Sequence, residues 1–301
     1  MKMTLDKFPP IKIPQSQLQI FVEQFNGTMR HARKTTRHVY EKGLDQLLSF
    51  AKANAFNFTP DNISEFQLWL FNRKKLSKNT VNVYLTACRR FCEFLVELGV
   101  LEKNPAWGVH GTAQEFKILK IKLAEVANAI SRIDRTTILG KRDFAFLCAI
   151  FECGAAISEL INADIGDLKN DGKETKLRVK PRGTRGKFEM ITLSESASAA
   201  VSDYLNSRSA IGGDEPLFGT VRGRRALKAR LSLRGARFAM HRRLDFGNKK
   251  TISLDSLRTY CVVRLMSKGK SSDEIRSIMR FKSDMPFRKI MFNTRAAAET
   301  R

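Results

Sequence analysis

The chain has 301 residues, 43% of them hydrophobic, so its length and composition predict two domains with ordinary packed cores. It has no apolar run of the roughly 18 residues that a membrane-spanning helix needs, and its N-terminus lacks the apolar core of a secretory signal. Lys and Arg number 54 against 30 Asp and Glu, a net charge of +24. A folded chain this basic repels itself unless a polyanion binds it, so we expect a cytoplasmic, nucleoid-associated protein whose partner is nucleic acid and not a membrane.

The densest basic segment runs from Arg222 to Lys250, where Asp245 is the one acidic residue. A basic helix that lies on a membrane carries an aromatic or leucine stripe opposite its charges, and this segment has few such residues. Its charge therefore favours DNA as the partner. An ordinary charged surface is the alternative interpretation.

The five cysteines are predicted to be reduced and mostly packed in the interior; they are Cys88, Cys92, Cys148, Cys153 and Cys261. Cys88 and Cys92 are spaced i, i+4, which suits one edge of a metal site, but no nearby His or Cys pair completes such a site. We therefore expect no metal and no small-molecule cofactor.

Helices are predicted through the first hundred residues, over 35–54, 59–75 and 77–99. Thr59 followed by Pro60 and, separately, Ser77 are typical helix starts, and Gly99 is a typical stop. Asn104-Pro105 then breaks the chain, and a stretch with two glycines and weak periodicity follows. We assign residues 1–104 to a helical domain, 105–116 to a linker and 117–301 to a second domain.

The second domain is predicted to be mixed. Helical patterns cover 122–133, 141–154, 194–207, 255–269 and 271–281, the last beginning with Ser271 and Glu274 at capping-box spacing. Two short strands around a glycine-containing turn fit 176–193. The predicted fold class is therefore α+β, mainly α with a small β component.

Four segments keep the order and spacing of a known family. They are "LSKNTVNVYLTACRRFCEFLVELGVLEKNPA", "KRDFAFLCAIFECGAAISELINADIGDL", "PLFGTVRGRRAL" and "SLDSLRTYCVVRLMSKG". The second keeps Gly154, Glu159, Leu160 and Asp167 where that family has Gly-x-Arg, Glu-Leu and a later Asp. Over nearly its full length the chain resembles the tyrosine recombinase (phage integrase) family. The resemblance implies a helical core-binding N-domain and a recombinase-like, catalytic-type C-domain.

The family cuts DNA without metal, and the resemblance identifies the positions that carry this chemistry. A tyrosine attacks a phosphodiester and forms a 3′-phosphotyrosyl link, while two arginines with histidines or a lysine stabilise charge and supply protons. The first arginine falls on Ala156 and the hairpin lysine on Arg182. In the His-x-x-Arg pattern the histidine is Asp255 and the second arginine is Arg258, followed by Thr259.

The nucleophile is missing in every register. A later histidine position falls on Phe281 or Lys282, and the tyrosine position on Ile290, Met291 or Phe292. None of the 4 tyrosines follows Tyr260, and none of the 4 histidines follows His241. The catalytic set is therefore predicted not to be intact. Tyr260, in the middle of a predicted helix, is interpreted as a core or groove-lining residue.

Seventeen cations are predicted to contact DNA: Arg33, Lys34, Arg37, Lys74, Lys75, Lys78, Arg89, Lys180, Arg182, Arg185, Lys187, Arg222, Arg224, Arg225, Arg242, Arg243 and Arg258. An ordinary solvated surface is the alternative for each group. For Arg258 the alternative is a buried ion pair with Glu159 or Asp167.

The apolar stretch from Met285 to Thr294 is predicted to be kept for packing and not for chemistry, because water penalises large apolar side chains that stay exposed.

The sequence thus predicts a double-stranded-DNA-binding protein with a recombinase fold and a degenerate active site. It would act as a repressor of a mobile element or as a non-cutting accessory in recombination, assembled on DNA with itself or with a related recombinase. One alternative is an active site-specific recombinase or integrase with unusual residues or a nucleophile from a partner subunit. Another is a structural or protein-interaction module that inherited a basic surface.

Overall fold

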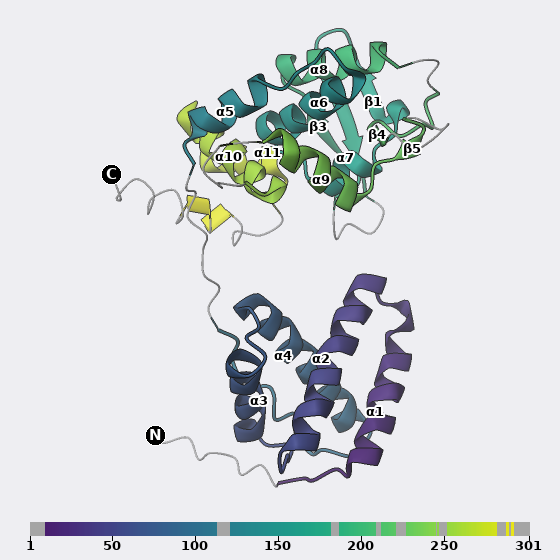
Figure 1. Ribbon diagram of the computed structural model, residues 1–301, viewed down its shortest axis with the longest axis vertical. Coiled ribbons are helices and arrows are strands. Elements are labelled where there is room, and N and C mark those ends of the chain that lie inside the picture. The colour runs from purple at the N-terminus through teal and green to yellow at the C-terminus, as the bar shows by residue number, and fades with distance from the viewer. Residues whose placement is uncertain are drawn as a thin grey trace. The chain divides into compact units, whose positions relative to one another are not determined.

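The computed structural model describes residues 10–112, 121–181, 187–208, 212–220, 227–244, 246, 252–281, 287–288 and 290–291. The chain divides into two compact units, Met1–Glu115 and Phe116–Arg301, and each has its own apolar core (Figure 1). Ala106 and Val109, which we assign from the sequence to the linker, are buried in the core of the first unit. The boundaries 105–116 for the linker stay a prediction.

The first unit is helical. Its elements are α1 (Gln15–Thr28), the 3-10 turn η1 (Met29–His31), α2 (Lys34–Ala53), α3 (Pro60–Asn72) and α4 (Lys78–Glu97). The helix starts predicted at Thr59 and Ser77 are confirmed, since these hydroxyls accept from the backbone N–H groups of Asn62 and Thr80. Helix α1 was not predicted.

The core of this unit is rich in aromatic rings. The rings of Phe50 and Phe66 lie 5.5 Å apart, and those of Phe25 and Phe91 lie 5.8 Å apart. Where α2 crosses α4, Gly43 lies so close that an added Cβ would stand 3.2 Å from the Cα of Tyr84. The missing side chain lets the two helices approach, and this contact fixes the long predicted helices side by side.

The second unit mixes helices with two small antiparallel sheets. Its helical elements are α5 (Leu123–Ser131), α6 (Ile138–Cys153), α7 (Ile157–Asn162), the 3-10 turn η2 (Ile165–Asp167), α8 (Glu195–Asn206), α9 (Leu233–Arg243), α10 (Leu254–Ser267) and α11 (Ser272–Met279). One sheet has the order β1 (Leu168–Asn170), β2 (Thr175–Val179), β3 (Glu189–Thr192), and the other pairs β4 (Gly219–Thr220) with β5 (Ala229–Arg230).

Helix α6 is the centre of this unit. It is buried on nearly every side from Ala145 to Phe151 and packs against α8 and α10 (Figure 1). Strands β2 and β3 contribute Leu177 and Ile191, which face each other in the register and are both buried. The predicted fold class, mainly helical with a small β component, is confirmed, as is the capping box at Ser271.

Within the described residues, no helix is both long and apolar enough to cross a bilayer. All five cysteines are buried and unpaired, as predicted, and burial raises the pKa of the Cys148 and Cys261 thiols to about 12.

The packing predicted for the C-terminal apolar stretch is confirmed at two of its residues. Phe287 and Ile290 are buried against α10 and α11 in a cluster with Cys261 and Met279, and Met291 packs against the same cluster. Met285, Phe292 and Thr294 lie outside the described residues.

We expect Phe287→Ala to lower the free energy of unfolding by about 3–5 kcal/mol, because it removes a buried aromatic side chain and leaves a cavity. The matched control is Phe238→Ala, which removes a ring that is 66% exposed and should change stability little. Urea unfolding of both variants measures the difference. Equal stability of the two would contradict the packing of this stretch.

Candidate functional site

The turn between α6 and α7 holds the position assigned to the first arginine. Helix α6 ends at Gly154, whose φ of 65° is left-handed and whose missing Cβ leaves room for the Met279 sulfur, 2.5 Å from where that Cβ would lie. Ala156 follows at the start of α7 and donates its backbone N–H to Glu159 Oε2 at 2.7 Å. A half-buried methyl group therefore lies at the position that we assign to the first arginine.

Arg258, which we predict to be the second family arginine, is bound to backbone carbonyls. Its Nε donates to the carbonyl of Gly154 at 2.8 Å and its Nη2 to that of Met279 at 2.5 Å, while its guanidinium lies 5.5 Å from the Phe281 ring centre. These carbonyls end α6 and α11, and helix C-termini favour cations. Burial lowers the pKa of Arg258, as does the nearby charge of Arg280, whereas Glu159 raises it.

The sequence left open a buried ion pair of Arg258 with Glu159 or Asp167. Within the described residues, neither carboxylate forms a salt bridge with Arg258. Asp167 binds Arg178 at 2.7 Å, and Glu159 binds Arg280 at 2.8 Å. Arg280 was not predicted as a site residue from the sequence. Its side chain is 7% exposed and that of Glu159 4%, so this is a buried ion pair.

Among the remaining family positions predicted from the sequence, the structure describes 255, 259, 281, 290 and 291. Asp255 is exposed in the first turn of α10, where a carboxylate is favourable, and accepts from Arg237 Nη2 at 3.3 Å. Thr259 is half-buried beside Arg258. Ile290 and Met291 pack against the apolar cluster at the C-terminal end and carry no hydroxyl.

Tyr260 is a core residue, which confirms one of its two interpretations. It is buried, and its hydroxyl donates to the carbonyl of Ile121 at 2.6 Å. Burial raises the pKa of this phenol. An anchored phenol with this environment is poorly suited to attack a phosphodiester.

The predicted DNA-contacting cations of the first unit fall at two helix starts. Arg33 and Lys34 are exposed where α2 begins, and Arg37 lies one turn further on, near Glu41 at 3.5 Å. Lys74, Lys75 and Lys78 are exposed between α3 and α4, with Lys74 4.8 Å from the Trp69 ring centre.

Arg89, on α4, has a different role. It donates from Nε to the carbonyl of Ala106 at 3.2 Å and from Nη2 to that of Val109 at 3.0 Å. These bonds fasten the segment that follows the helical bundle, so the geometry favours a structural role for this arginine.

In the second unit the structure separates adjacent arginines on α9. Arg243 binds Asp143 at 3.0 Å, a carboxylate that is buried and also held by Arg142. Arg242 is exposed and lies 5.8 Å from the Phe238 ring centre. Lys180 and Lys187 are exposed at the ends of the β2–β3 hairpin. Arg182, Arg185, Arg222, Arg224, Arg225 and Lys282 lie outside the described residues.

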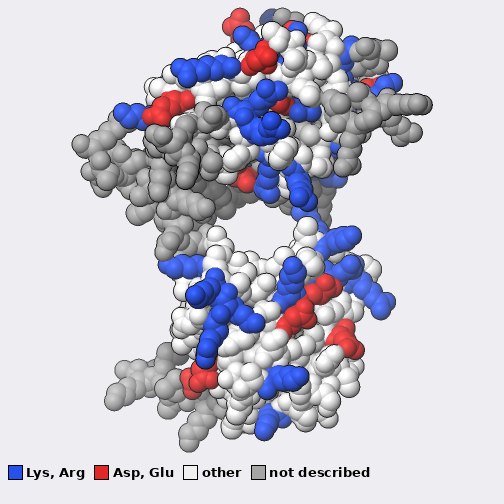
Figure 2. Space-filling view, viewed as in Figure 1, with Lys and Arg blue, Asp and Glu red and all other residues white. Residues whose placement is uncertain are grey.

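Helix α9 presents a basic stripe that the sequence reading missed. Ala236 and Met240 are buried, and the opposite face exposes Arg234, Arg237, Phe238, His241 and Arg242. This i, i+3, i+4, i+7, i+8 spacing is present in the sequence and is typical of one face of a helix. It was overlooked because the surrounding residues are also basic. Figure 2 shows more Lys and Arg than Asp and Glu on the visible face of each unit.

We expect Arg243→Ala to lower the free energy of unfolding by about 1–3 kcal/mol, because it removes a hydrogen bond to a buried carboxylate. Arg242→Ala, one residue earlier, is the control and should leave stability unchanged within about 0.5 kcal/mol. Chemical denaturation of both variants checks this. A larger loss for Arg242→Ala than for Arg243→Ala would contradict the assigned roles.

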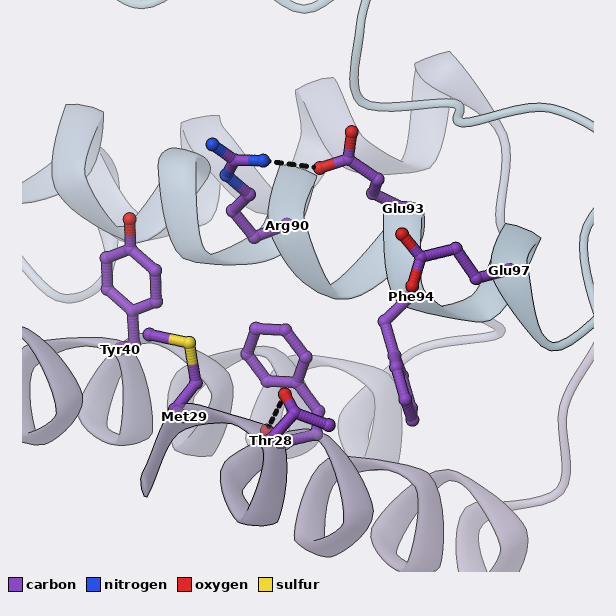
Figure 3. Close-up of a pocket in the computed structure, with 8 residues that line it drawn as sticks. Thr28, Met29, Tyr40, Arg90, Glu93, Phe94 and Glu97 are labelled. Carbon is purple, nitrogen blue, oxygen red and sulfur yellow. Dashed lines mark hydrogen bonds and ion pairs between the residues drawn. The ribbon is translucent and has the colours of Figure 1, made fainter. Parts of the chain in front are cut away.

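A hollow of about 410 Å³ lies in the first unit, apart from every predicted site residue. Side chains from α1, η1, α2 and α4 surround it (Figure 3); they are Phe25, Thr28, Met29, Tyr40, Arg90, Glu93, Phe94 and Glu97. Arg90 and Glu93 pair at 2.8 Å, and Glu97 adds a second carboxylate. This lining carries more negative than positive charge and does not suit a phosphate.

Among the described residues, no three His, Cys, Asp or Glu side chains gather as metal ligands. The functional geometry thus consists of two guanidiniums at converging helix ends, with basic surfaces on both units. Together with the fold, it defines a protein of the tyrosine recombinase type.

Comparison with models of protein families identifies the family to which this chain belongs. Residues 18–99 match the phage integrase N-terminal SAM-like domain, and residues 122–286 match the phage integrase family. The chain belongs to the phage integrase family, whose members act in DNA recombination and integration.

Two relatives carry the name tyrosine recombinase XerC. The chain is 26% identical to that of Shewanella sp. (strain ANA-3) over 238 residues, which is 76% of this chain and 78% of the relative. It is 27% identical to that of Haemophilus influenzae (strain 86-028NP) over 228 residues, which is 72% of this chain and 76% of the relative.

Solved structures share the fold. The XerH site-specific recombinase bound to difH substrate, a pre-cleavage complex, matches with a TM-score of 0.71 and 14% identity over 94% of this chain and 95% of that one. A lambda integrase dimer bound to a COC′ core site matches with a TM-score of 0.68 and 14% identity over 89% of this chain and 96% of that one.

Proposed function

We propose that this protein binds duplex DNA and does not cut it by the tyrosine chemistry of its family. It acts as a repressor of a mobile element or as a non-cutting accessory in recombination. One observation carries the proposal. We assign the nucleophile position to Ile290, Met291 or Phe292, of which the first two pack against an apolar cluster, and no tyrosine follows Tyr260 in the sequence.

The charge-stabilising groups support the same conclusion. Cleavage needs fixed cations where negative charge grows on the phosphate, and loss of one such donor typically costs about 10²–10³ in rate. Residue 156 supplies a methyl group, and Arg258 commits two of its nitrogen atoms to backbone carbonyls. Asp255 would repel a phosphate where the family has a histidine.

DNA as the partner is supported by the surfaces. The exposed face of α9 sets three arginines and a histidine around Phe238, which suits an anionic backbone beside apolar base edges. Cations at the starts of α2 and α4 suit further phosphates. The XerH and lambda integrase structures are DNA complexes, and the latter is a dimer, which supports an oligomer of this chain, or with a related recombinase, on DNA.

We expect no covalent DNA–protein adduct when the protein is incubated with nicked suicide duplexes and run on denaturing gels. The reason is the absent nucleophile. An active recombinase of known competence is the positive control on the same gel. An adduct with the protein alone would contradict the proposal, and an adduct formed only with a related recombinase present, on this chain's own half-site, would favour a nucleophile supplied by the partner.

We expect affinity for duplex DNA to fall steeply with salt, with a log–log slope of roughly −0.9 per neutralised phosphate. The triple variant Arg234→Ala/Arg237→Ala/Arg242→Ala should make that slope less negative by up to about 3. Lys169→Ala/Lys173→Ala, which removes exposed cations from β1 and the turn after it, is the control and should leave the slope nearly unchanged. Fluorescence anisotropy across a salt series measures both. An affinity for duplex DNA that does not change with salt concentration would exclude DNA as the partner.

A further inference from the structure

One oxygen of Glu159 joins the position of the missing arginine to a residue far away in the chain. Glu159 Oε2 accepts the backbone N–H of Ala156 at 2.7 Å and Arg280 Nη2 at 2.8 Å. The guanidinium of Arg280 therefore ends beside the place where the side chain of residue 156 begins. Arg280 reaches there from the end of α11, 121 residues after Glu159.

We propose that Arg280 supplies, from α11, the guanidinium that residue 156 lacks, and that it positions Arg258 for a phosphodiester of bound DNA. The first half of this inference rests on geometry alone. The second half rests on the proposed function.

The backbone of Arg280 shows that its side chain is held there by its surroundings. Its φ of 55° and ψ of 42° are left-handed, a conformation that is unfavourable for a residue with a side chain. Such conformations persist where neighbouring contacts over-determine them. Here Nη1 donates to the carbonyl of Ile278 at 2.8 Å and Nη2 to that of Gly154 at 3.1 Å.

Arg258 and Arg280 meet at the same acceptor. The carbonyl of Gly154 accepts from Nε of Arg258 at 2.8 Å as well as from Arg280. The two guanidiniums thus share one carbonyl, Glu159 binds Arg280 alone, and the three charged groups together keep one excess positive charge. An anion beside it offsets the repulsion between the two cations.

Two donors of this cluster remain for a ligand. Arg280 Nε is buried and has no hydrogen-bond partner among the described residues. Arg258 uses Nε and Nη2, which leaves Nη1 without a bond inside the same described set. A buried donor without a partner, such as Arg280 Nε, is costly, and a phosphate oxygen is an acceptor that arginines favour. Moving Arg280 would release the carbonyl of Gly154 and let Arg258 shift, so Arg280 acts on the phosphate through Arg258.

A cycle of four proteins tests the relocation by thermal unfolding: the native chain, Ala156→Arg, Arg280→Gly and the double variant. Arg280→Gly suits the left-handed backbone but strands the buried Glu159, so we expect a melting temperature lower by roughly 10 °C. In the double variant an arginine at 156 reaches the same carboxylate and should recover at least half of that loss. Ala156→Arg alone gives two guanidiniums to one carboxylate and should stabilise nothing.

The matched control is Ala156→Gln in the Arg280→Gly background. Glutamine is polar but uncharged and is shorter than arginine, so it should not restore the melting temperature. Additive effects in the cycle, or equal rescue by glutamine, would overturn the relocation.

The phosphate role is tested with a duplex selected from a random pool by the native protein. Arg280→Gly should reduce affinity and make the log–log salt slope less negative by about 1, and the double variant should recover both. Unchanged affinity in Arg280→Gly would overturn the phosphate role. If the native protein selects no duplex, the proposed function fails, while the melting cycle still decides the relocation.

Discussion

The arrangement of the second unit depends on how two helix C-termini are neutralised. Helices α6 and α11 end with carbonyl groups that converge on the guanidinium of Arg258, and Gly154 turns the chain away at a left-handed φ that also clears space for Met279. A partial negative charge at each helix end and a cation between them is a favourable alignment. Because α6 is also the buried centre of the unit, this contact links the core to the C-terminal apolar cluster.

The net charge of +24 is therefore only partly a surface property. Backbone carbonyls or buried carboxylates bind Arg89, Arg142, Arg243, Arg258 and Arg280. Arg208 binds the carbonyl of Pro216 and the half-buried carboxylate of Glu215. Arginine suits such sites because its planar fork satisfies several acceptors at once. The lysines predicted to contact DNA in the first unit, in contrast, lie at helix starts and in the turn between α3 and α4. The cations that remain exposed, such as the stripe on α9, are the ones that a polyanion can reach.

The features that could be predicted from the sequence are those that depend on residues close together in the chain. Thr59, Ser77 and Ser271 mark helix starts because their hydroxyls bond backbone groups within three residues, and periodicity placed the long helices. The partners of Arg258 could not be predicted in this way, because its bond to Gly154 spans 104 residues. Helix α9 was missed since a dense basic run obscures the apolar period. Arg280 was missed because comparison with the family's motif shows only which expected residues are absent. It does not show that a residue elsewhere in the chain binds Glu159.

Residues 156 and 280 are consequently not independent positions. A methyl at 156 is compatible with the buried Glu159 because Arg280 neutralises that carboxylate, and an arginine at 280 is compatible with a left-handed backbone because Glu159 and Gly154 bind its side chain. Effects of residues that act as one unit are not additive. A substitution at 156 therefore has to be judged together with the residue at 280. Glu159 is already neutralised by Arg280, so an arginine added at 156 would place a second guanidinium against the same carboxylate.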